Sequence, residues 1–162
     1  MSVVLSLGSN LGDREALLRE AVRAIAAIEG VTVTRASAIV ETPALKPHGI
    51  DVDAPAYLNA ALLVETTLEP LALLSALGEV EQGAGRTREE RWGDRTLDID
   101  IVAWGDLVLD TEQLTIPHPR AGSRDFVLAP WLEIDAEARL GGIHLSELLD
   151  TRPARFDAEP LL

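Results

Sequence analysis

The sequence predicts an α+β sandwich, in which helices pack on one face of a mainly antiparallel sheet. The chain has 162 residues, of which 47% are hydrophobic and 25% are charged. This length and balance predict one globular domain over residues 1–162 with a sizeable core. Strand-like and helix-like hydrophobic patterns then alternate along the chain, which favours an α+β fold.

The first expected strand is a short apolar run that ends at the turn Gly8-Ser9-Asn10. An amphipathic helix follows and stops at Gly30, and Pro70 near the start of a second helix fits the first helical turn. The expected order of elements is strand, helix, strand, strand, helix, strand, over residues 3–7, 13–29, 31–41, 57–67, 68–82 and 96–104. This order is the βαββαβ pattern of the ferredoxin-like sandwich.

Proline and glycine predict the connections between these elements. Long loops, typical of functional segments, are expected over residues 42–56 and 83–93. A hairpin is expected where Gly105-Asp106 leads into residues 107–109. We also expect short helices over 130–138 and 145–150, and a loosely ordered tail after about residue 152.

The charge and composition of the chain argue against several classes of partner and site. It carries 14 basic and 27 acidic residues, a net charge of −13, and no cysteine. A surface this acidic repels nucleic acid and acidic membranes, and thiolate metal sites and disulfides are excluded. Without a basic signal-like start or a long apolar run, a cytoplasmic location is expected. A polyanionic substrate would need local arginines or bound cations.

Asp98 and Asp100 form the strongest chemical motif. On a strand they share one face, with Cα atoms about 6.6 Å apart, while Leu97, Ile99 and Ile101 point to the other face. Carboxylates so placed repel each other unless a cation lies between them, and Mg²⁺ prefers such oxygen ligands. The alternative is an amphipathic strand with two solvated acids.

An arginine-rich segment directly precedes this pair. Residues 85–95 carry Arg86, Arg88, Arg91 and Arg95 between glycines. Arginine binds phosphate oxygens in a bidentate fashion, and flanking glycines permit a lid to move. For this segment taken by itself, the alternative is a solvated loop whose own acidic residues neutralise most of the arginine charge. Arginines beside paired aspartates are better explained by Mg²⁺ and a phosphorylated nucleotide.

Several blocks together give a specific resemblance over about residues 1–150. They are Leu7 to Gly12, Glu41-Thr42-Pro43, Tyr57 to Ala61, Glu81 with Gly85-Arg86, Arg91 to Asp100, Leu114 to Pro119 and Arg124 to Pro130. The sequence thereby resembles the 6-hydroxymethyl-7,8-dihydropterin pyrophosphokinases of folate biosynthesis, whose pattern is R-W-G-P-R-x-x-D-x-D. Asp94 stands where that pattern has proline, Gln113 where an arginine often precedes Leu-Thr, and the 46–55 loop is longer than in compact members.

The resemblance implies a monomeric transferase that moves pyrophosphate from ATP to the hydroxymethyl group of the pterin and releases AMP. It implies two Mg²⁺ ions held by Asp98 and Asp100, with Arg86 and Arg95 as catalytic arginines. The implied ATP contacts are Glu81, Arg86, Arg95, Ile101, Thr115, His118 and Arg124, and the implied pterin contacts are Thr42, Pro43, Leu45, Tyr57, Asn59, Trp92 and Phe126.

Three of these residues also have an ordinary structural explanation. Without the resemblance, Tyr57 and Phe126 fit ordinary core packing and His118 fits a turn between two prolines. Asn59 is different, because an amide in an apolar strand needs a ligand or a backbone partner. Two rival functions remain: a non-catalytic ferredoxin-like regulatory domain that binds a small molecule, and a structural partner that docks a basic protein on the acidic surface. Mg²⁺-dependent AMP formation would exclude the first, and salt-sensitive, ATP-independent binding would indicate the second.

Overall fold

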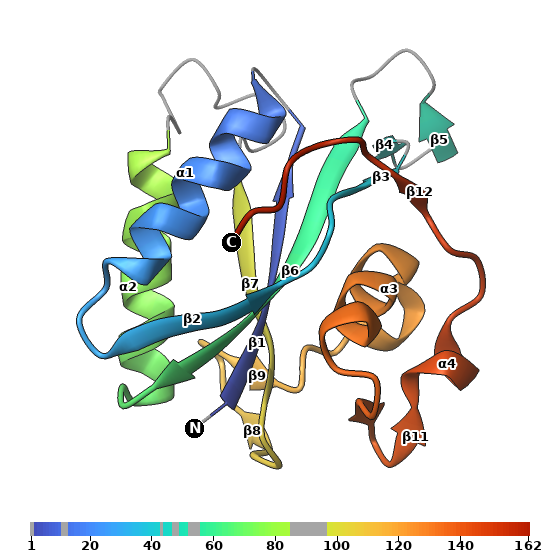
Figure 1. Ribbon diagram of the computed structural model, residues 1–162. Coiled ribbons are helices and arrows are strands. Elements are labelled where there is room, and N and C mark those ends of the chain that lie inside the picture. Colours follow the sequence, from blue (N-terminus) through green and yellow to red (C-terminus); the bar gives the residue numbers. More distant parts are fainter. Residues whose placement is uncertain (1, 11–12, 43, 47–48, 52–55, 85–96) are drawn as a thin grey trace.

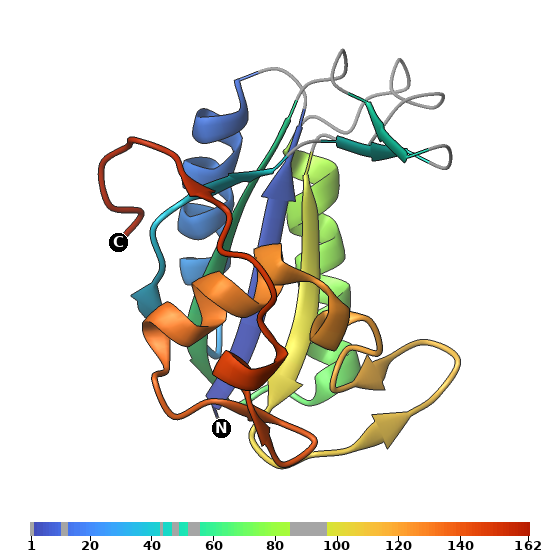
Figure 2. The same ribbon diagram turned by 90° about the vertical axis from the view of Figure 1, so that its right-hand side faces the viewer.

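Figures 1 and 2 show the computed structural model of the chain as a sheet with helices on both sides. The described residues are 2–10, 13–42, 44–46, 49–51, 56–84 and 97–162, with backbone only for 44–46 and 49–51. The structure thus describes both ends of the two long segments that the sequence predicts as loops.

An antiparallel sheet forms the centre of the molecule. Its strands are β1 (Ser2–Ser9), β2 (Val31–Ala36), β3 (Val40–Thr42), β6 (Tyr57–Thr66), β7 (Asp98–Trp104) and β12 (Ala154–Arg155). They lie in the order β12-β3-β6-β1-β7, and β2 also pairs with β6. The path β7-β1-β6-β2 is the order expected of a βαββαβ sandwich, so the predicted α+β fold class is confirmed. The predicted strand 31–41 is split into β2 and β3.

Helices α1 (Arg14–Ala26) and α2 (Pro70–Gly83) cover one face of the sheet. Asp13 caps α1, because its Oδ1 accepts the Ala16 N–H at 3.1 Å. Leu5 and Leu7 of β1 point toward these helices and are fully buried in the core there. Both helices start and end close to the residues that the periodicity predicts.

A second core on the opposite face corrects the expectation that all helices share one face. Helix α3 (Asp125–Ile134) and the short α4 (Leu145–Leu148) pack there. Val4 of β1, Val102 of β7 and Leu128 of α3 belong to this second cluster. The reason is that β1 is apolar at consecutive positions, so it buries both of its faces.

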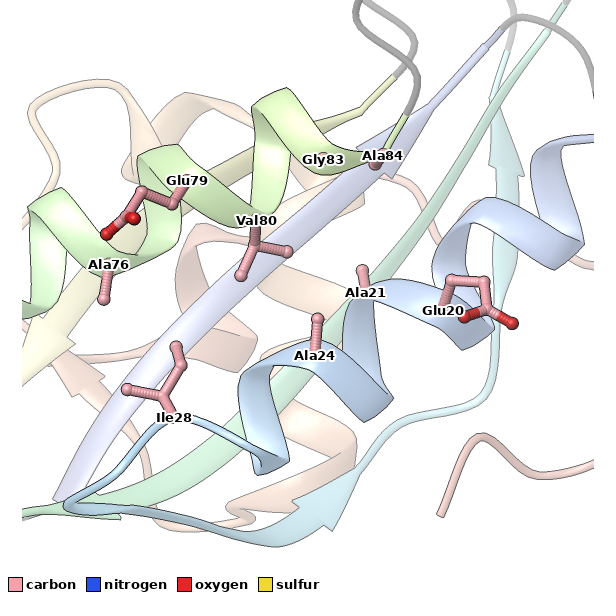
Figure 3. Close-up of a pocket in the computed structure, with 9 residues that line it drawn as sticks. All are labelled: Glu20, Ala21, Ala24, Ile28, Ala76, Glu79, Val80, Gly83 and Ala84. Carbon is pink, nitrogen blue, oxygen red and sulfur yellow. The ribbon is translucent and has the colours of Figure 1, made fainter.

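A shallow groove runs between α1 and α2 on the outer side of the molecule (Figure 3). Small side chains let the helices approach each other, and the lining residues are Glu20, Ala21, Ala24, Ile28, Ala76, Glu79, Val80, Gly83 and Ala84. None of the residues predicted to bind substrate or metal lines it. We therefore place the chemistry elsewhere in the molecule.

Short strands occupy the connecting segments. β4 (Ala44–Lys46) and β5 (Gly49–Asp51) form a hairpin within the predicted 42–56 loop. β8 (Leu109–Asp110) pairs with β9 (Thr115–Ile116), and the 3₁₀ turn Ala121–Ser123 leads to α3. The predicted hairpin of residues 107–109 on β7 is therefore wrong: Leu107 N–H closes a turn on the Trp104 carbonyl, and the chain then pairs with β9. β10 (Arg139–Leu140) and β11 (Ile143–His144) form the remaining ribbon.

The tail after residue 152 is ordered against the body, where the sequence predicts loose order. β12 pairs with β3, and the Phe156 N–H donates to the Ile39 carbonyl at 2.9 Å. Beyond it, the Arg19 guanidinium donates to the Pro160 and Glu159 carbonyls. Figure 1 shows the tail crossing from β12 toward α1. The exposed edge of β3 explains this order, since an unpaired strand edge recruits another strand.

No helix in the described part of the chain is both long and apolar enough to cross a membrane.

Candidate active site

A cavity of about 530 Å³ lies between one end of the sheet and the start of α3. Its lining comes from four strands and from residues 123–126 at the start of α3, and the residues are Ser6, Gly8, Thr42, Tyr57, Asn59, Asp98, Asp100, Ser123, Arg124 and Phe126. Seven of these are residues that the sequence predicts for substrate or metal, although they are separated by up to 84 positions from Thr42 to Phe126. We refer to this cavity as the sheet pocket.

The backbone ladder of the sheet sets the spacing within the sheet pocket. Gly8 of β1 pairs with Asn59 of β6 on one side and with Asp98 of β7 on the other. Ser6 lies opposite Asp100 in the same way. Neighbouring strands are about 5 Å apart, so Asn59 and Asp98 lie roughly 10 Å apart across Gly8.

Asn59 is buried, with 5% of its surface exposed, and its amide is held by its neighbours. Its Nδ2 lies 3.5 Å from the Leu7 carbonyl, and Thr42 Oγ1 lies 3.4 Å from Asn59 Oδ1. A Cβ atom at Gly8 would come within 2.8 Å of Asn59 Nδ2. A larger residue at position 8 would therefore displace the amide from its present position on the pocket floor.

Asp98 and Asp100 alternate on β7 and both line the sheet pocket, as the sequence predicts. Between them Ile99 points into the other core, and its N–H donates to Glu81 Oε2 at 2.7 Å. Glu81, at the end of α2, thus braces the strand at the position that separates the two acids. The predicted ATP residue Glu81 has at least this one contact with the protein itself.

The start of α3 supplies the opposite wall. The Arg124 guanidinium lies over the Phe126 ring, with its Cζ 5.6 Å from the ring centroid. Asp125 between them accepts the Asp150 and Thr151 N–H groups at 2.9 Å, which anchors the wall to the C-terminal segment. Arg124, predicted for ATP, therefore shares a pocket with the predicted pterin residue Phe126.

A second cavity of about 260 Å³ lies beside β7 and is lined by three of the predicted ATP residues, Ile101, Thr115 and His118. Its lining residues are Leu74, Ile99, Asp100, Ile101, Glu112, Gln113, Leu114, Thr115, His118 and Pro119. Asp100 lines both cavities, so they meet at the second of the paired acids, whereas Asp98 lines the sheet pocket. We refer to this cavity as the β7 pocket.

His118 in the β7 pocket has its pKa lowered from the ordinary value of 6.5. Partial burial is the main cause, and the positive charges of Arg124 and Arg120 lower the pKa further, while Asp100 opposes the shift. His118 Nδ1 accepts the Arg120 N–H at 3.2 Å, and the His118 N–H donates to the Val102 carbonyl at 2.8 Å. At neutral pH the imidazole is therefore uncharged, and because Nδ1 accepts, its proton is on Nε2, which can donate a hydrogen bond.

The donor set at the two acids suits a hard divalent cation. Within the described residues, no group of three or more His, Cys, Asp or Glu side chains gathers around one point. Mg²⁺ keeps several waters and commonly takes one or two carboxylates together with substrate phosphates. Two carboxylates at the junction of two cavities fit that mode of binding better than a closed protein cage.

Some predicted site residues lie outside this description. Pro43, Arg86, Trp92 and Arg95 are not among the described residues, and neither is Asp94. Leu45 lies on β4, where only the backbone is described. The cationic side chains that the sequence predicts for the phosphates, apart from Arg124, therefore all belong to the segment 85–96.

Sequence reasoning missed three residues of the sheet pocket: Ser6, Gly8 and Ser123. Ser6 is the one hydroxyl within the apolar run Val3 to Leu7, and this is the signal that could have found it. Gly8 is predicted as part of a turn and of the Leu7 to Gly12 block, but with no role in the site. Ser123 precedes the Arg124 block and has no comparable signal.

Comparisons with known proteins agree with one another. The family model described as 7,8-dihydro-6-hydroxymethylpterin-pyrophosphokinase (HPPK) matches residues 4–136. The 2-amino-4-hydroxy-6-hydroxymethyldihydropteridine pyrophosphokinase of Bacillus subtilis is 47% identical over 130 residues, covering 80% of this chain and 75% of the relative. The enzyme of the same name from Methylorubrum extorquens is 41% identical over 145 residues, covering 90% and 89%.

Solved structures show the same fold at lower identity. The crystal structure of a Plasmodium falciparum HPPK-DHPS triple mutant superposes with a TM-score of 0.68 at 15% identity and covers 91% of this chain. The match spans 42% of that longer chain, so the remainder of it has no counterpart here.

Proposed function

The chain belongs to the 7,8-dihydro-6-hydroxymethylpterin-pyrophosphokinase family, and from that premise we propose which residues perform its reaction. The protein transfers pyrophosphate from ATP to the hydroxymethyl group of hydroxymethyldihydropterin in folate synthesis, and AMP is released. The alternative of a non-catalytic regulatory domain is not favoured. The residue roles below are our proposal.

The sheet pocket is the proposed pterin site. A flat heterocycle needs aromatic contact and a few fixed polar groups. Tyr57 and Phe126 line this pocket from opposite walls, and Thr42 and Asn59 offer hydroxyl and amide groups on its floor. Pro43, Leu45 and Trp92 are predicted to complete the enclosure. The hydroxymethyl group would then point along the floor toward Asp98.

Asp98 and Asp100 are the proposed ligands of Mg²⁺, with two ions expected. Bound at these acids, Mg²⁺ neutralises the triphosphate and stabilises the charge that develops during transfer. The two carboxylates supply the negative charge that draws the cation to the meeting point of the two pockets. Without a cation, these acids would repel ATP, so metal dependence follows from the charge of the site itself.

The β7 pocket is the proposed nucleotide site, with Ile101, Thr115 and His118 as contacts and Glu81 bracing β7. The hydroxyl oxygen of the pterin forms a bond to the β-phosphorus of ATP. The bond from that phosphorus to the oxygen that bridges the α- and β-phosphates breaks, and AMP leaves with that oxygen and the electron pair. The hydroxyl proton goes to solvent. Arg86, Arg95 and Arg124 are proposed to hold the phosphates, so catalysis rests mainly on alignment and electrostatics.

The single observation that carries these roles is that Gly8 places Asn59 and Asp98 on the same face of the sheet, two strand spacings apart. The test is to incubate the protein with ATP, Mg²⁺ and 6-hydroxymethyl-7,8-dihydropterin and to measure AMP and the pterin diphosphate. We expect equal amounts of both products, and none when the metal is chelated. Product formation in full after chelation would refute the metal role.

A monomeric state, a cytoplasmic location and a single domain over residues 1–162 stay predictions. Sedimentation of the purified protein at several concentrations tests the first of these.

A further inference from the structure

Arg14, the first residue of α1, contacts two neighbouring strands of the sheet through its side chain. Its Nη1 donates to Glu41 Oε2 at 3.1 Å and to the Ala56 carbonyl at 2.6 Å. Glu41 lies on β3 just before Thr42, and Ala56 directly precedes Tyr57 of β6. One guanidinium nitrogen therefore holds the two stems that flank segment 43–55.

The contact lies at the end of the pairing between β3 and β6 that is next to the sheet pocket. The ladder between β3 and β6 ends at the pair Thr42–Tyr57. Ala56 lies one residue beyond that pair, so the bond from Arg14 continues the connection where the described backbone pairing stops. Thr42 and Tyr57, the last pair, both line the sheet pocket.

The C-terminal tail covers the other side of the same guanidinium. Arg14 Cζ lies 6.0 Å from the centroid of the Phe156 ring, and Phe156 is fixed by its N–H bond to the Ile39 carbonyl. The Arg14 side chain is 25% exposed, and that of Glu41 is 39% exposed. A partly desolvated guanidinium with a carboxylate, a carbonyl and an aromatic face around it keeps one orientation.

We propose that Arg14 is a positioning residue for the pterin site: by bridging Glu41 and Ala56 it holds in place the end of the β3–β6 ladder, where Thr42 and Tyr57 form the last pair. The inference rests on the proposed function, because it takes the sheet pocket as the pterin site. Arg14 itself does not line that pocket, so its effect passes through the two stems. Pre-organising a site reduces the ordering cost of binding, and removing the bridge should weaken the ligand held there.

The test compares Arg14→Met with Arg23→Met. Methionine keeps the apolar stem against Phe156 but removes both donors. Arg23 is a matched control on the same helix, with an exposed ion pair to Glu20 and no described contact to β3 or β6. Affinity for the pterin is measured with 6-hydroxymethylpterin in the presence of Mg²⁺ and a non-hydrolysable ATP analogue, and turnover is measured separately with the true substrates.

For Arg14→Met we expect the Kd and KM for the pterin to rise about tenfold, as for the loss of one charge-assisted bridge, with the affinity for the ATP analogue within about twofold. Arg14→Lys should recover part of the loss, since an ammonium can still donate to one partner. Arg23→Met should behave as wild type. A merely structural role would instead weaken both ligands equally.

Unchanged pterin affinity in folded Arg14→Met, or an equal loss for the ATP analogue, overturns the proposal. If Arg14→Met does not fold, Glu41→Gln carries the test, and there we expect a rise of about threefold in the pterin Kd, with no change counting against the proposal. Tyr57→Ala separates the two hypotheses: undiminished pterin affinity there would refute the sheet pocket as the pterin site, and a wild-type protein that forms no AMP would refute the proposed function.

Discussion

The two pockets that meet at Asp100 are built in different ways. The sheet pocket takes residues from β1, β3, β6, β7 and the start of α3, and its floor is a hydrogen-bonded ladder. The β7 pocket takes its wall mostly from residues 112–119, which fold locally around the short β8–β9 pair. The first pocket has its dimensions set by the sheet, and the second by a local turn.

This difference predicts that substitutions in the two pockets have effects of different size on ligand binding. Substitutions on the sheet floor should change recognition of the pterin sharply, because side chains there have no room to adjust. Substitutions in the β7 pocket should have smaller effects, because half of its wall is surface loop. The paired acids form a third class, because Asp100 lines both pockets and Asp98 lies beside it on the same face of β7.

The largest expected effect comes from the acids. Asp98→Ala and Asp100→Ala should each lower kcat by a factor on the order of 1,000 or more, because the proposed Mg²⁺ loses a carboxylate and the phosphate charge is no longer neutralised. Asp106→Ala, an exposed acid in the turn after β7, is the control and should keep wild-type turnover. AMP release at the normal rate by either variant would show that these acids hold no catalytic cation.

Asn59→Ala should come next, with pterin affinity reduced about 10- to 100-fold and ATP affinity nearly unchanged. The buried amide is expected to make direct hydrogen bonds to the ligand, and a ligand group left unpaired in a desolvated site costs about 1–3 kcal/mol. Calorimetric titration with each ligand measures both affinities. Equal losses for pterin and nucleotide would contradict the division between the pockets.

Gly8→Ala tests the same floor from the backbone. The added Cβ would lie 2.8 Å from Asn59 Nδ2, so the amide must move. We expect an about threefold to tenfold loss of pterin affinity and a destabilisation of about 1–3 kcal/mol. Gly78→Ala in α2 is the matched control: its Cβ meets nothing within 4 Å, and alanine should stabilise the helix by about 0.5–1 kcal/mol. Thermal unfolding distinguishes the two.

The smallest effect concerns His118 in the β7 pocket. Its pKa is lowered in the folded state, so the unfolded chain takes up the proton first as pH falls. Folding stability should therefore decline as pH drops below about 6.5, and the decline should end below the folded pKa. His118→Gln should flatten this dependence in metal-free protein, as followed by urea unfolding between pH 5 and 8. An identical pH profile in wild type and variant would contradict the conclusion that burial lowers the pKa of His118.

Sequence alone predicted the placement of the two acids on the floor of the sheet pocket better than the placement of its walls. Alternation along β7 was enough to place Asp98 and Asp100 on one face, because a strand has a strict two-residue period. The resemblance, rather than any pattern, identified Tyr57 and Asn59. No pattern could show that Gly8 separates Asn59 from Asp98, since register between distant strands depends on the whole sheet.

The errors have a common physical origin. Helix α3 is apolar over nearly its whole length from Phe126 to Leu132, so its sequence does not show which face of the sheet it covers. The continuous apolar runs of β1 and β6 were the available signal, because strands buried on both faces lose their alternation. The order of the tail likewise depends on the exposed edge of β3, which is a property of the folded sheet rather than of residues 152–162.

Gly8 also limits what this scaffold can become. Backbone hydrogen bonds scarcely stretch, so the distance from the Asn59 amide, which is proposed to bind the pterin, to Asp98 changes only in whole strand spacings and cannot be adjusted by a fraction of an ångström. Exchanging side chains can alter which flat molecule is preferred. A ligand whose reactive group lies one ring width farther from its recognised edge would require another strand between β6 and β7. Point mutations cannot introduce such a strand.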